Sequence, residues 1–263
     1  MRVAGIIPAR YASSRFNGKA LALIEGKTLI RHVYERALSS RCLNELMVAT
    51  DDSRIAREVE GFGGKAVLTS PEHKCGTERA AEVARKLDAD FVVNIQGDEM
   101  ISAGEMIDEC VSPLLGDSSL NVSTLAVEIR NKCDLNDPNV VKVVRGLNGD
   151  ALFFSRSPIP YAPLASLGTV RAETGVEQGV EFLRHVGIYG FKRTFLLDFV
   201  RLGQTPLELA ECLEQLRILE RGHRIAVVLT NHSCVGVDVP SDIKKATAFL
   251  ASLAGPVHKG RVH

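Results

Sequence analysis

Residues 3–21 read VAGIIPARYASSRFNGKAL, and this stretch decides how the start of the chain folds. Its apolar run, Val3–Ile7, has the length of a buried strand and stops at Pro8. The loop that follows carries three cations among small residues, at Arg10, Arg15 and Lys19. Backbone N–H groups and cations on such a loop can surround phosphate oxygens, because arginine forms forked contacts and lysine provides a mobile point charge. The stretch predicts either a loop that binds a nucleoside triphosphate or a solvated loop with ordinary surface cations.

Strand and helix patterns alternate outward from this stretch. Apolar runs typical of buried strands lie at Arg2–Ile7 and at residues 45–50, 65–70 and 90–96. Helical patterns lie between and after them, at Thr28–Leu38, 51–64, 77–87 and Ser102–Leu114, the last opened by a capping box of Ser102 and Glu105. The alternation predicts an α/β fold, a three-layer sandwich around a mostly parallel sheet. Ligands of such folds sit beyond the carboxyl ends of the strands, where residues 9–15 and 96–99 fall.

The pattern changes after residue 120. Short strand-like runs at 121–129, 140–144, 150–156 and 185–191 predict an antiparallel edge, and residues 162–181 predict a surface loop or excursion. Helices are predicted at Pro206–Gly222 and Pro240–Leu253, on either side of a strand at Ile225–Leu229. We therefore predict one domain over residues 1–253, with an antiparallel excursion over about 120–190, and a flexible tail over 254–263.

Composition excludes several classes of protein. Of the 263 residues 45% are hydrophobic, so a sizeable core is possible. Lys+Arg and Asp+Glu both number 32, so no overall field attracts nucleic acid or an anionic membrane. No apolar run has the length of a membrane span or of a signal peptide's apolar region. The six cysteines form no C-x-x-C pair, so we expect reduced thiols in the cytoplasm rather than a zinc knuckle.

The usual nucleotide-binding fingerprints are missing. No G-x-G-x-x-G follows the first strand. The GKT at Gly26–Thr28 matches the end of a P-loop motif, but Leu21 stands where that motif needs its first glycine.

Two aspartates are candidates for a magnesium site. Asp98 follows a predicted buried strand, and Asp238 precedes Pro240, the expected first residue of the last helix. Magnesium uses one or two carboxylates together with phosphate oxygens. The alternatives are a turn at Gly97–Asp98 and a helix-entry carboxylate at Asp238, although Val239 would be a poor N-cap residue.

Two further patterns place polar residues where either a binding site or an ordinary structural role would explain them. On the helix predicted from Pro206, a polar stripe of Glu208, Glu211 and Gln215 lies beside an apolar face, and Glu208 also fits a capping box with Thr205. In the run 185–191, period-2 alternation places His185, Gly187 and Tyr189 on one face, as in any half-buried strand.

Together these segments resemble a known family. IIPARYASSR…GK, VATDD, GTER, NIQGDE, DPNVVKVV, FSRSPIP, RHVGIYGF, PLELAECLEQLRILERG and GVDVPSD occur in this order over about residues 3–250. The series resembles the 3-deoxy-manno-octulosonate cytidylyltransferases, and RHVGIYGF and LEQLR are its most specific parts. The segment FNGKAL lacks two prolines usual in the family, which implies a more mobile loop before substrate binds.

The resemblance implies a Rossmann-like nucleotidyltransferase fold with a dimerising excursion, hence a homodimer. It implies that CTP is coupled to the acid sugar Kdo (3-deoxy-D-manno-octulosonate), with Mg²⁺, for lipopolysaccharide synthesis. The implied nucleotide-binding residues are Ala9, Arg10, Ser14, Lys19, Gly76, Thr77 and Arg79. The implied sugar-binding residues are Gln96, Arg156, His185, Tyr189, Glu211 and Gln215. Asp98 and Asp238 would bind the metal, and Arg10, Lys19 and Asp98 would be catalytic.

The reaction expected is attack of the sugar's anomeric hydroxyl on the α-phosphorus of CTP, with pyrophosphate leaving. Positioning and charge neutralisation would supply the catalysis. The general base stays open between His185 and a metal-bound water or hydroxyl. Two alternatives to Kdo transfer also stay open, namely another acid sugar, such as a sialic acid or 8-amino-Kdo, and a catalytically silent nucleotide-binding protein.

Overall fold

The computed structural model describes residues 1–13, 15–130, 132–161 and 181–253. The chain divides into two compact units, the first formed by Met1–Asp108 with the residues from His232 onward, and the second by Glu109–Asn231. The helix α4 (Glu105–Gly116) runs through the division. The excursion predicted for about 120–190 falls in the second unit, and the predicted loop at 162–181 and tail at 254–263 lie, except for residue 181, outside the described residues.

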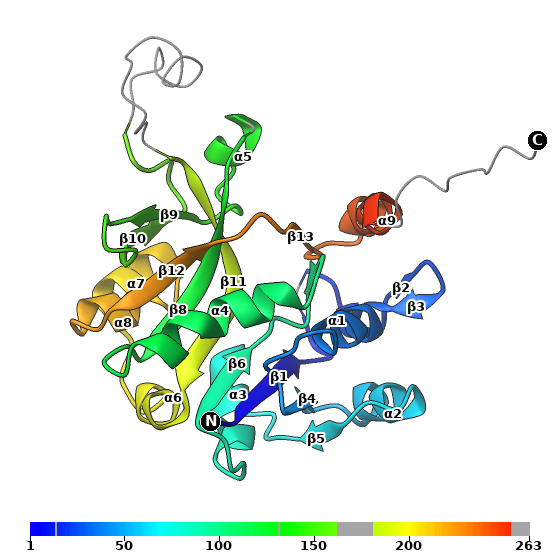
Figure 1. Cartoon of the computed structure of the whole chain (residues 1–263). Helices are drawn as coiled ribbons and strands as arrows, with labels where there is room; N and C mark the ends of the chain where they lie inside the picture. Colours follow the sequence, from blue (N-terminus) through cyan, green and yellow to red (C-terminus); the bar gives the residue numbers. More distant parts are fainter. Residues whose placement is uncertain (14, 131, 162–180, 254–263) are drawn as a thin grey trace, which may run out of the picture. The chain divides into compact units, whose positions relative to one another are not determined.

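The first unit is built on a four-stranded parallel sheet. Its strands are β6 (Phe91–Asn94), β1 (Val3–Ala9), β4 (Glu45–Thr50) and β5 (Ala66–Leu68), in that spatial order. All seven residues of β1 are buried, because the strand is central and covered on both faces. Helices α1 (Leu29–Ala37), α2 (Ser53–Gly61) and α3 (Gly76–Ala84) link the strands (Figure 1). The order of the strands reverses after β5, so right-handed crossovers place α3 on the face opposite α1 and α2.

Smaller elements complete the first unit. A 3-10 turn, η1 (Lys19–Leu21), leads into the hairpin of β2 (Leu23–Ile24) and β3 (Lys27–Thr28). The strand β7 (Glu99–Ile101) pairs antiparallel with β13 (Cys234–Gly236), and α9 (Asp242–Leu253) follows. This pairing joins segments that lie far apart in the sequence, and it brings the start of the last helix to the end of β6.

The second unit holds the predicted antiparallel strands. The spatial order is β10 (Ala151–Ser155), β9 (Lys142–Arg145), β11 (Leu183–Lys192), β8 (Val122–Glu128) and β12 (Ile225–Leu229). Neighbouring strands are antiparallel except for β12, which runs parallel to β8. The pairing of β11 with β8 is irregular between Val186 and Tyr189. The helices of this unit, besides α4, are α5 (Lys132–Asn136), α6 (Arg193–Phe199), α7 (Pro206–Glu211) and α8 (Leu216–Glu220).

The helix predicted at Pro206–Gly222 is wrong, because two short helices stand there. Cys212 ends α7 in the left-handed conformation, with φ of 52°. The Glu220 carboxylate accepts from the backbone N–H of Leu207 at 3.1 Å. In one continuous helix these residues would lie about 20 Å apart. The break also exposes 58% of Leu209, which the continuous helix would have turned to the core.

Two predicted helix starts are also wrong. The helix α4 begins at Glu105, and the Ser102 hydroxyl accepts from the N–H of Ser233 instead of capping that helix. The last helix begins at Asp242 rather than at Pro240. Before α4, the contact with the distant Ser233 takes up the Ser102 hydroxyl that would otherwise cap the helix. Before α9, a tight turn that the Asp242 side chain holds takes the place of the expected first helical turn.

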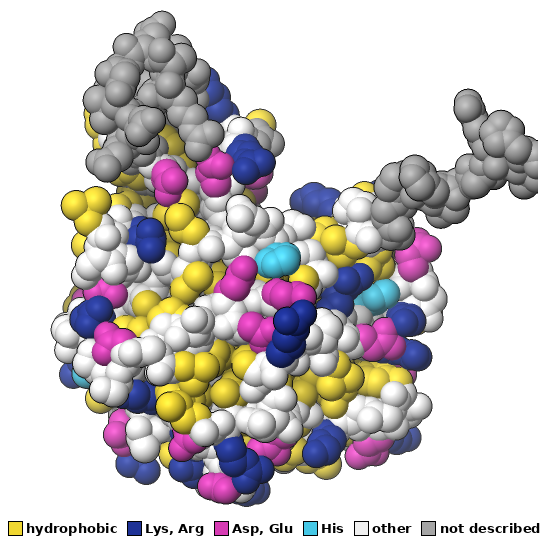
Figure 2. Space-filling view, in the orientation of Figure 1, with side chains coloured by type: hydrophobic (Ala, Val, Ile, Leu, Met, Phe, Trp, Pro, Cys, Tyr) yellow, Lys and Arg dark blue, Asp and Glu magenta, His cyan; other side chains and the backbone are white. Residues whose placement is uncertain are grey.

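The surface carries charges of both signs. Figure 2 shows Lys and Arg side chains interspersed with Asp and Glu on the face in view, as the balanced composition predicts. Within the described ranges, no helix combines the length and the apolar character that crossing a membrane would require.

Candidate active site

A pocket of about 360 Å³ lies in the first unit, at the carboxyl ends of β1 and β6. This volume is typical of small-molecule sites. Three segments provide most of the wall: the loop after β1, the loop before α3, and the turn after β6. The residues that line it are Pro8, Ala9, Arg10, Ser13, Arg15, Lys19, Ala20, His73, Lys74, Cys75, Gly76, Arg79, Gln96, Gly97, Asp98 and Asp238.

Most of the residues predicted to bind nucleotide or metal therefore meet at this pocket. Two do not appear in its wall. Ser14 lies outside the described residues. Thr77 is buried, and its hydroxyl accepts a hydrogen bond from the Asn94 amide at 3.2 Å. Gln96, which the resemblance assigns to the sugar, also lines the pocket.

A glycine allows the floor of the pocket to form. A Cβ at Gly97 would lie 2.7 Å from the carbonyl oxygen of Pro8, closer than a side chain can approach. The turn after β6 can therefore pass directly against the end of β1. The loop after β1 is closed by a backbone hydrogen bond from Gly18 to the Tyr11 carbonyl, and the guanidinium of Arg54 lies 3.3 Å from the centroid of the Tyr11 ring.

Backbone pairing brings the two candidate metal ligands together. The N–H of Val237 donates to the Asp98 carbonyl at 2.8 Å and extends the pairing of β7 with β13. The side chain of Asp242 accepts from the N–H groups of Asp238 and Val239 and so fixes the turn before α9. The Asp238 carboxylate is consequently not a helix-entry cap, and it points its charge at the pocket cations.

Lys19 lies between the two aspartates. Its ammonium donates to Asp98 Oδ2 at 2.6 Å and reaches Asp238 Oδ1 at 3.4 Å, and Arg15 donates to the same Asp238 oxygen at 2.9 Å. The Lys19 side chain is only 14% exposed. Because both carboxylates contact one ammonium, their oxygens are close enough to share a single cation.

The carboxylate oxygens of Asp98 and Asp238 suit a magnesium ion. Mg²⁺ is held by one or two carboxylates when phosphate oxygens and water complete its shell. Within the described part of the chain, no cluster of three or more His, Cys, Asp or Glu side chains is placed to hold a metal. The pair Asp98 and Asp238 therefore fits a metal that arrives with a nucleotide better than a metal held by protein ligands alone.

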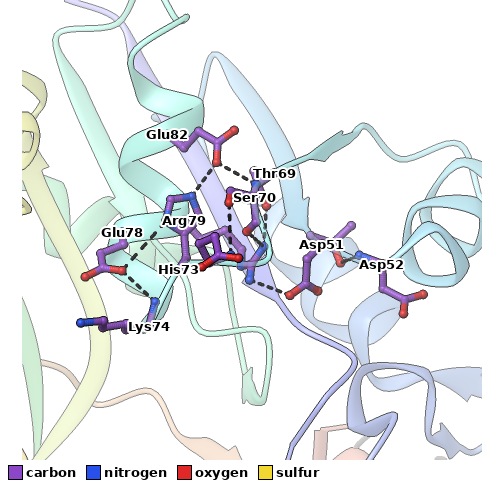
Figure 3. Close-up of polar contacts among 11 residues, drawn as sticks. Asp51, Asp52, Thr69, Ser70, His73, Lys74, Glu78, Arg79 and Glu82 are labelled. Atoms are coloured by element: carbon purple, nitrogen blue, oxygen red, sulfur yellow. Dashed lines mark hydrogen bonds and ion pairs between the residues drawn. The ribbon is translucent and has the colours of Figure 1, made fainter.

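Polar side chains of α3 hold the loop that precedes it (Figure 3). Arg79 is 3% exposed, and its guanidinium donates to Thr69 Oγ1 at 2.5 Å and to Asp51 at 2.9 Å. Glu82 accepts from the N–H of Ser70 at 2.9 Å. Arg79 thus lines the pocket, but its guanidinium N–H groups donate to Asp51, just after β4, and to Thr69 and Ser70 of this loop.

In the second unit, Arg156 and Glu211 lie together. The Glu211 carboxylate accepts from the Ser155 hydroxyl at 2.6 Å and from the N–H of Arg156 at 2.9 Å. The Arg156 guanidinium donates to the carbonyls of Glu211 and Pro138, both at 2.9 Å. Lys142 is fully buried and donates to three carbonyls, those of Asp137, Val140 and Arg156.

His185 and Tyr189 also lie together, with ring centroids 5.2 Å apart on β11. Burial, and to a lesser degree the charge of Arg184, lowers the pKa of His185 to about 3. Nε2 lies 3.0 Å from Thr124 Oγ1. An imidazole with so low a pKa is a weak base at neutral pH, which argues against His185 as the general base. Gln215 is buried at the N-terminus of α8.

The sequence patterns missed several residues of this framework. They are Asp51, His73, Glu82, Thr124, Lys142 and Ser155. One signal was available, since Lys142 interrupts an apolar strand in VVKVV, where a charged residue needs buried partners. The others look like ordinary surface, cap or strand residues in the sequence.

A model of the cytidylyltransferase family matches residues 4–225. The 3-deoxy-manno-octulosonate cytidylyltransferase of Geobacter metallireducens is 49% identical over 251 residues, 95% of this chain and 98% of its own length. The one from Geotalea daltonii is 50% identical over 93% of this chain and 96% of its own length. The chain belongs to the 3-deoxy-manno-octulosonate cytidylyltransferase family.

The solved structures agree with this assignment. A CMP:2-keto-3-deoxy-manno-octonic acid synthetase complexed with CTP is 40% identical, with a TM-score of 0.85 over 96% of this chain and 99% of that one. A 4-diphosphocytidyl-2C-methyl-D-erythritol synthase from Anaerococcus prevotii, 12% identical with a TM-score of 0.61 over 95% of this chain and 98% of that one, shares the fold. As a member of the family, the protein is a nucleotidyltransferase with the α/β fold that the sequence predicts.

Proposed function

We propose that this cytidylyltransferase couples CTP to Kdo, giving CMP-Kdo and pyrophosphate for lipopolysaccharide synthesis. The observation that carries the proposal is the pocket in which Lys19 lies between Asp98 and Asp238, with Arg10 in the same wall. Such a site offers cations for a triphosphate and carboxylates for its metal. The relatives and the CTP complex described above support CTP as the nucleotide and Kdo as the sugar.

In the reaction, an oxygen–phosphorus bond forms between the anomeric hydroxyl of the sugar and the α-phosphorus of CTP. The bond from the α-phosphorus to the oxygen that bridges to the β-phosphorus breaks, and pyrophosphate leaves with that oxygen. The hydroxyl proton passes to solvent water, since His185 is too weakly basic to take it. Arg10 and Lys19 neutralise the charge that builds up on the phosphate oxygens.

Asp98 and Asp238 would hold Mg²⁺, as their shared contact with one cation supports. The ion would shield the triphosphate's charge and polarise its phosphoryl oxygens. Lys19 has the length and the freedom of a lysine side chain to contact a phosphate oxygen from its place in η1. Arg15 contributes a second cation beside Asp238.

For the sugar we propose Gln96, Arg156, His185, Tyr189, Glu211 and Gln215, and for the nucleotide Ala9, Ser14, Gly76, Thr77 and Arg79 in addition to Arg10 and Lys19. The Arg156 guanidinium could meet a sugar carboxylate only with those of its donors that backbone carbonyls leave free. His185, neutral at physiological pH, can donate or accept a hydrogen bond without charge. A cytoplasmic homodimer is proposed with this function, on the family resemblance alone.

Pyrophosphate release tests the proposal. Purified enzyme should release pyrophosphate from CTP and Mg²⁺ only when Kdo is added, and excess EDTA should stop the release. A parallel panel of 8-amino-Kdo and a sialic acid identifies the sugar. Higher kcat/KM with another acid sugar would replace Kdo by that sugar. No release with any of them would support the silent nucleotide-binding protein instead.

A further inference from the structure

The loop that precedes α3, Thr69–Cys75, forms one wall of the pocket through His73, Lys74 and Cys75. Its residues belong to no strand or helix, and the N–H of Thr69 donates to the carbonyl of Thr50 at the end of β4. Side chains from α3 also reach back to hold the loop, as Figure 3 shows. We call residues 69–75 the pocket loop.

Glu82 bridges Ser70 and His73 of the pocket loop with one oxygen. Its Oε2 accepts from the N–H of Ser70 at 2.9 Å and lies 2.5 Å from Nε2 of His73. The bond from Ser70 and, after it, the contact with His73 lower the pKa of Glu82. An ionised carboxylate can only accept, so Nε2 of His73 is the donor in this contact. Glu82 does not itself line the pocket, whereas His73 does.

The other two α3 side chains hold one end each. Arg79 donates to Thr69 and to the Ser70 carbonyl, at the start of the pocket loop. Near the end of the loop, Glu78 accepts from the N–H of Lys74 at 2.7 Å and lies 3.9 Å from Nδ1 of His73. Among the side chains drawn in Figure 3, Glu82 alone spans the loop from Ser70 to His73.

We propose that Glu82 is a positioning residue that sets the preference for CTP over UTP by fixing the pocket loop; this inference rests on the proposed function. The two nucleotides share the triphosphate, which the proposed function assigns to Arg10 and Lys19 in another wall of the pocket. They differ at the base edge, where cytosine has an amino donor and uracil an oxygen acceptor. A rigid polar wall rejects the wrong edge, because its donors and acceptors are then left unpaired. A mobile wall can reorient its donors and acceptors and so pair with either base edge.

The test compares the binding of CTP and of UTP, each with Mg²⁺, to the enzyme without sugar, by titration calorimetry. In Glu82→Ala, which removes the acceptor, we expect CTP to bind about tenfold more weakly and the CTP/UTP affinity ratio to fall by about as much. Glu82→Gln keeps an acceptor oxygen but loses the charge that strengthens both hydrogen bonds, so its ratio should fall by about threefold, between wild type and Glu82→Ala. Glu72→Gln, an exposed carboxylate of the same loop, is the matched control and should match wild type.

Each result distinguishes the positioning role from a structural one. Glu82→Ala that melts at a lower temperature but keeps the wild-type CTP/UTP ratio while folded would overturn the inference. If Glu82→Ala does not fold, an unchanged ratio in Glu82→Gln does the same, and failure of both to fold makes Glu82 a folding residue and overturns it too. Wild-type enzyme that binds UTP as well as CTP would instead overturn the proposed nucleotide.

Discussion

Replacing Glu208 by glutamine should destabilise the second unit strongly, because it removes a charge that is buried and paired. Glu208 and Arg217 form an ion pair whose side chains are 5% and 7% exposed. Nε of Arg217 donates to Glu208 Oε2 at 2.8 Å, and the N–H of Thr205 donates to the same oxygen at 3.2 Å. The Arg217 guanidinium lies 4.8 Å from the centroid of Phe199. The pair thus ties α7 to α8 and α6.

The neutral amide that Glu208→Gln introduces would remove the charge that pairs with the buried guanidinium of Arg217. Breaking a buried pair in this way costs about 3–5 kcal/mol, a large share of the roughly 5–15 kcal/mol that stabilises a typical domain. Urea unfolding followed by circular dichroism at pH 7 measures the loss. Glu128→Gln is the control, because its partner Arg130 is 82% exposed and such surface pairs contribute less than about 1 kcal/mol. The double variant Glu208→Leu with Arg217→Met should recover much of the stability, since no unpaired charge remains.

The pH dependence gives a second measure of the same pair. Burial alone would raise the pKa of Glu208, but hydrogen bonds from Arg217 and Thr205 and the charge of Arg217 outweigh it and lower the pKa. A lowered pKa contributes stability above the unfolded value near 4.5, and this contribution is lost as the pH falls through the folded value. The difference between wild type and Glu208→Gln should therefore shrink below about pH 4.5. A difference under about 1 kcal/mol at pH 7, or one that does not change with pH, would refute this reasoning.

Four further predictions concern activity and acid stability. Asp98→Asn should lower kcat for pyrophosphate release by about 100-fold or more while the protein stays folded, and near-normal turnover at saturating Mg²⁺ would contradict a metal-ligand role. Wild-type enzyme should use CTP at least about tenfold better than UTP, ATP or GTP in kcat/KM, and equal rates would exclude recognition of the base. The pKa of His185 is about 3 in the folded protein and 6.5 in the free side chain, so the unfolded state binds the proton first as the pH falls. On account of this residue, wild type should lose up to about 1.4 kcal/mol of stability for each pH unit between pH 6.5 and pH 3. His185→Asn should show a shallower loss on urea unfolding over that range, and an equal slope would count against a neutral, part-buried imidazole. Gln215→Ala should raise the KM for Kdo by up to about tenfold and leave that for CTP unchanged, whereas an unaltered Kdo KM would assign Gln215 to the structure of α8 alone.

The nucleotide side of the site could be predicted from sequence because local rules place it. Strand β1 is a continuous apolar run that ends in a loop of cations, and Asp98 follows the buried strand β6. In a parallel sheet both strand ends must open on the same edge. Asp238 was harder, since its place depends on the pairing of β7 with β13, which no local pattern predicts.

The framework behind the site could not be predicted in the same way. Glu82 and Lys142 act through bonds to backbone groups of loops, and such bonds leave no periodicity in the sequence. Two of the three contacts of the Lys142 ammonium are with carbonyls two and five residues away, and the third, with Arg156, depends on β9 pairing with β10. A lysine inside an apolar strand predicts that buried acceptors exist, but not which residues provide them.

The break between α7 and α8 shows why a correct local pattern can still give a wrong element. Residues 206–222 have good helical periodicity, but a helix that short gains little from propensity alone. Pairing Glu208 with Arg217, and Glu220 with the start of α7, satisfies a buried charge and N–H groups that a straight helix would leave to solvent. The break also ends α7 at Glu211, whose carboxylate then binds the end of β10 through Ser155 and Arg156. The resemblance, rather than the polar stripe, assigned Glu211 to the sugar. Glu211 meets Arg156 through hydrogen bonds to the end of β10 and not through helical spacing.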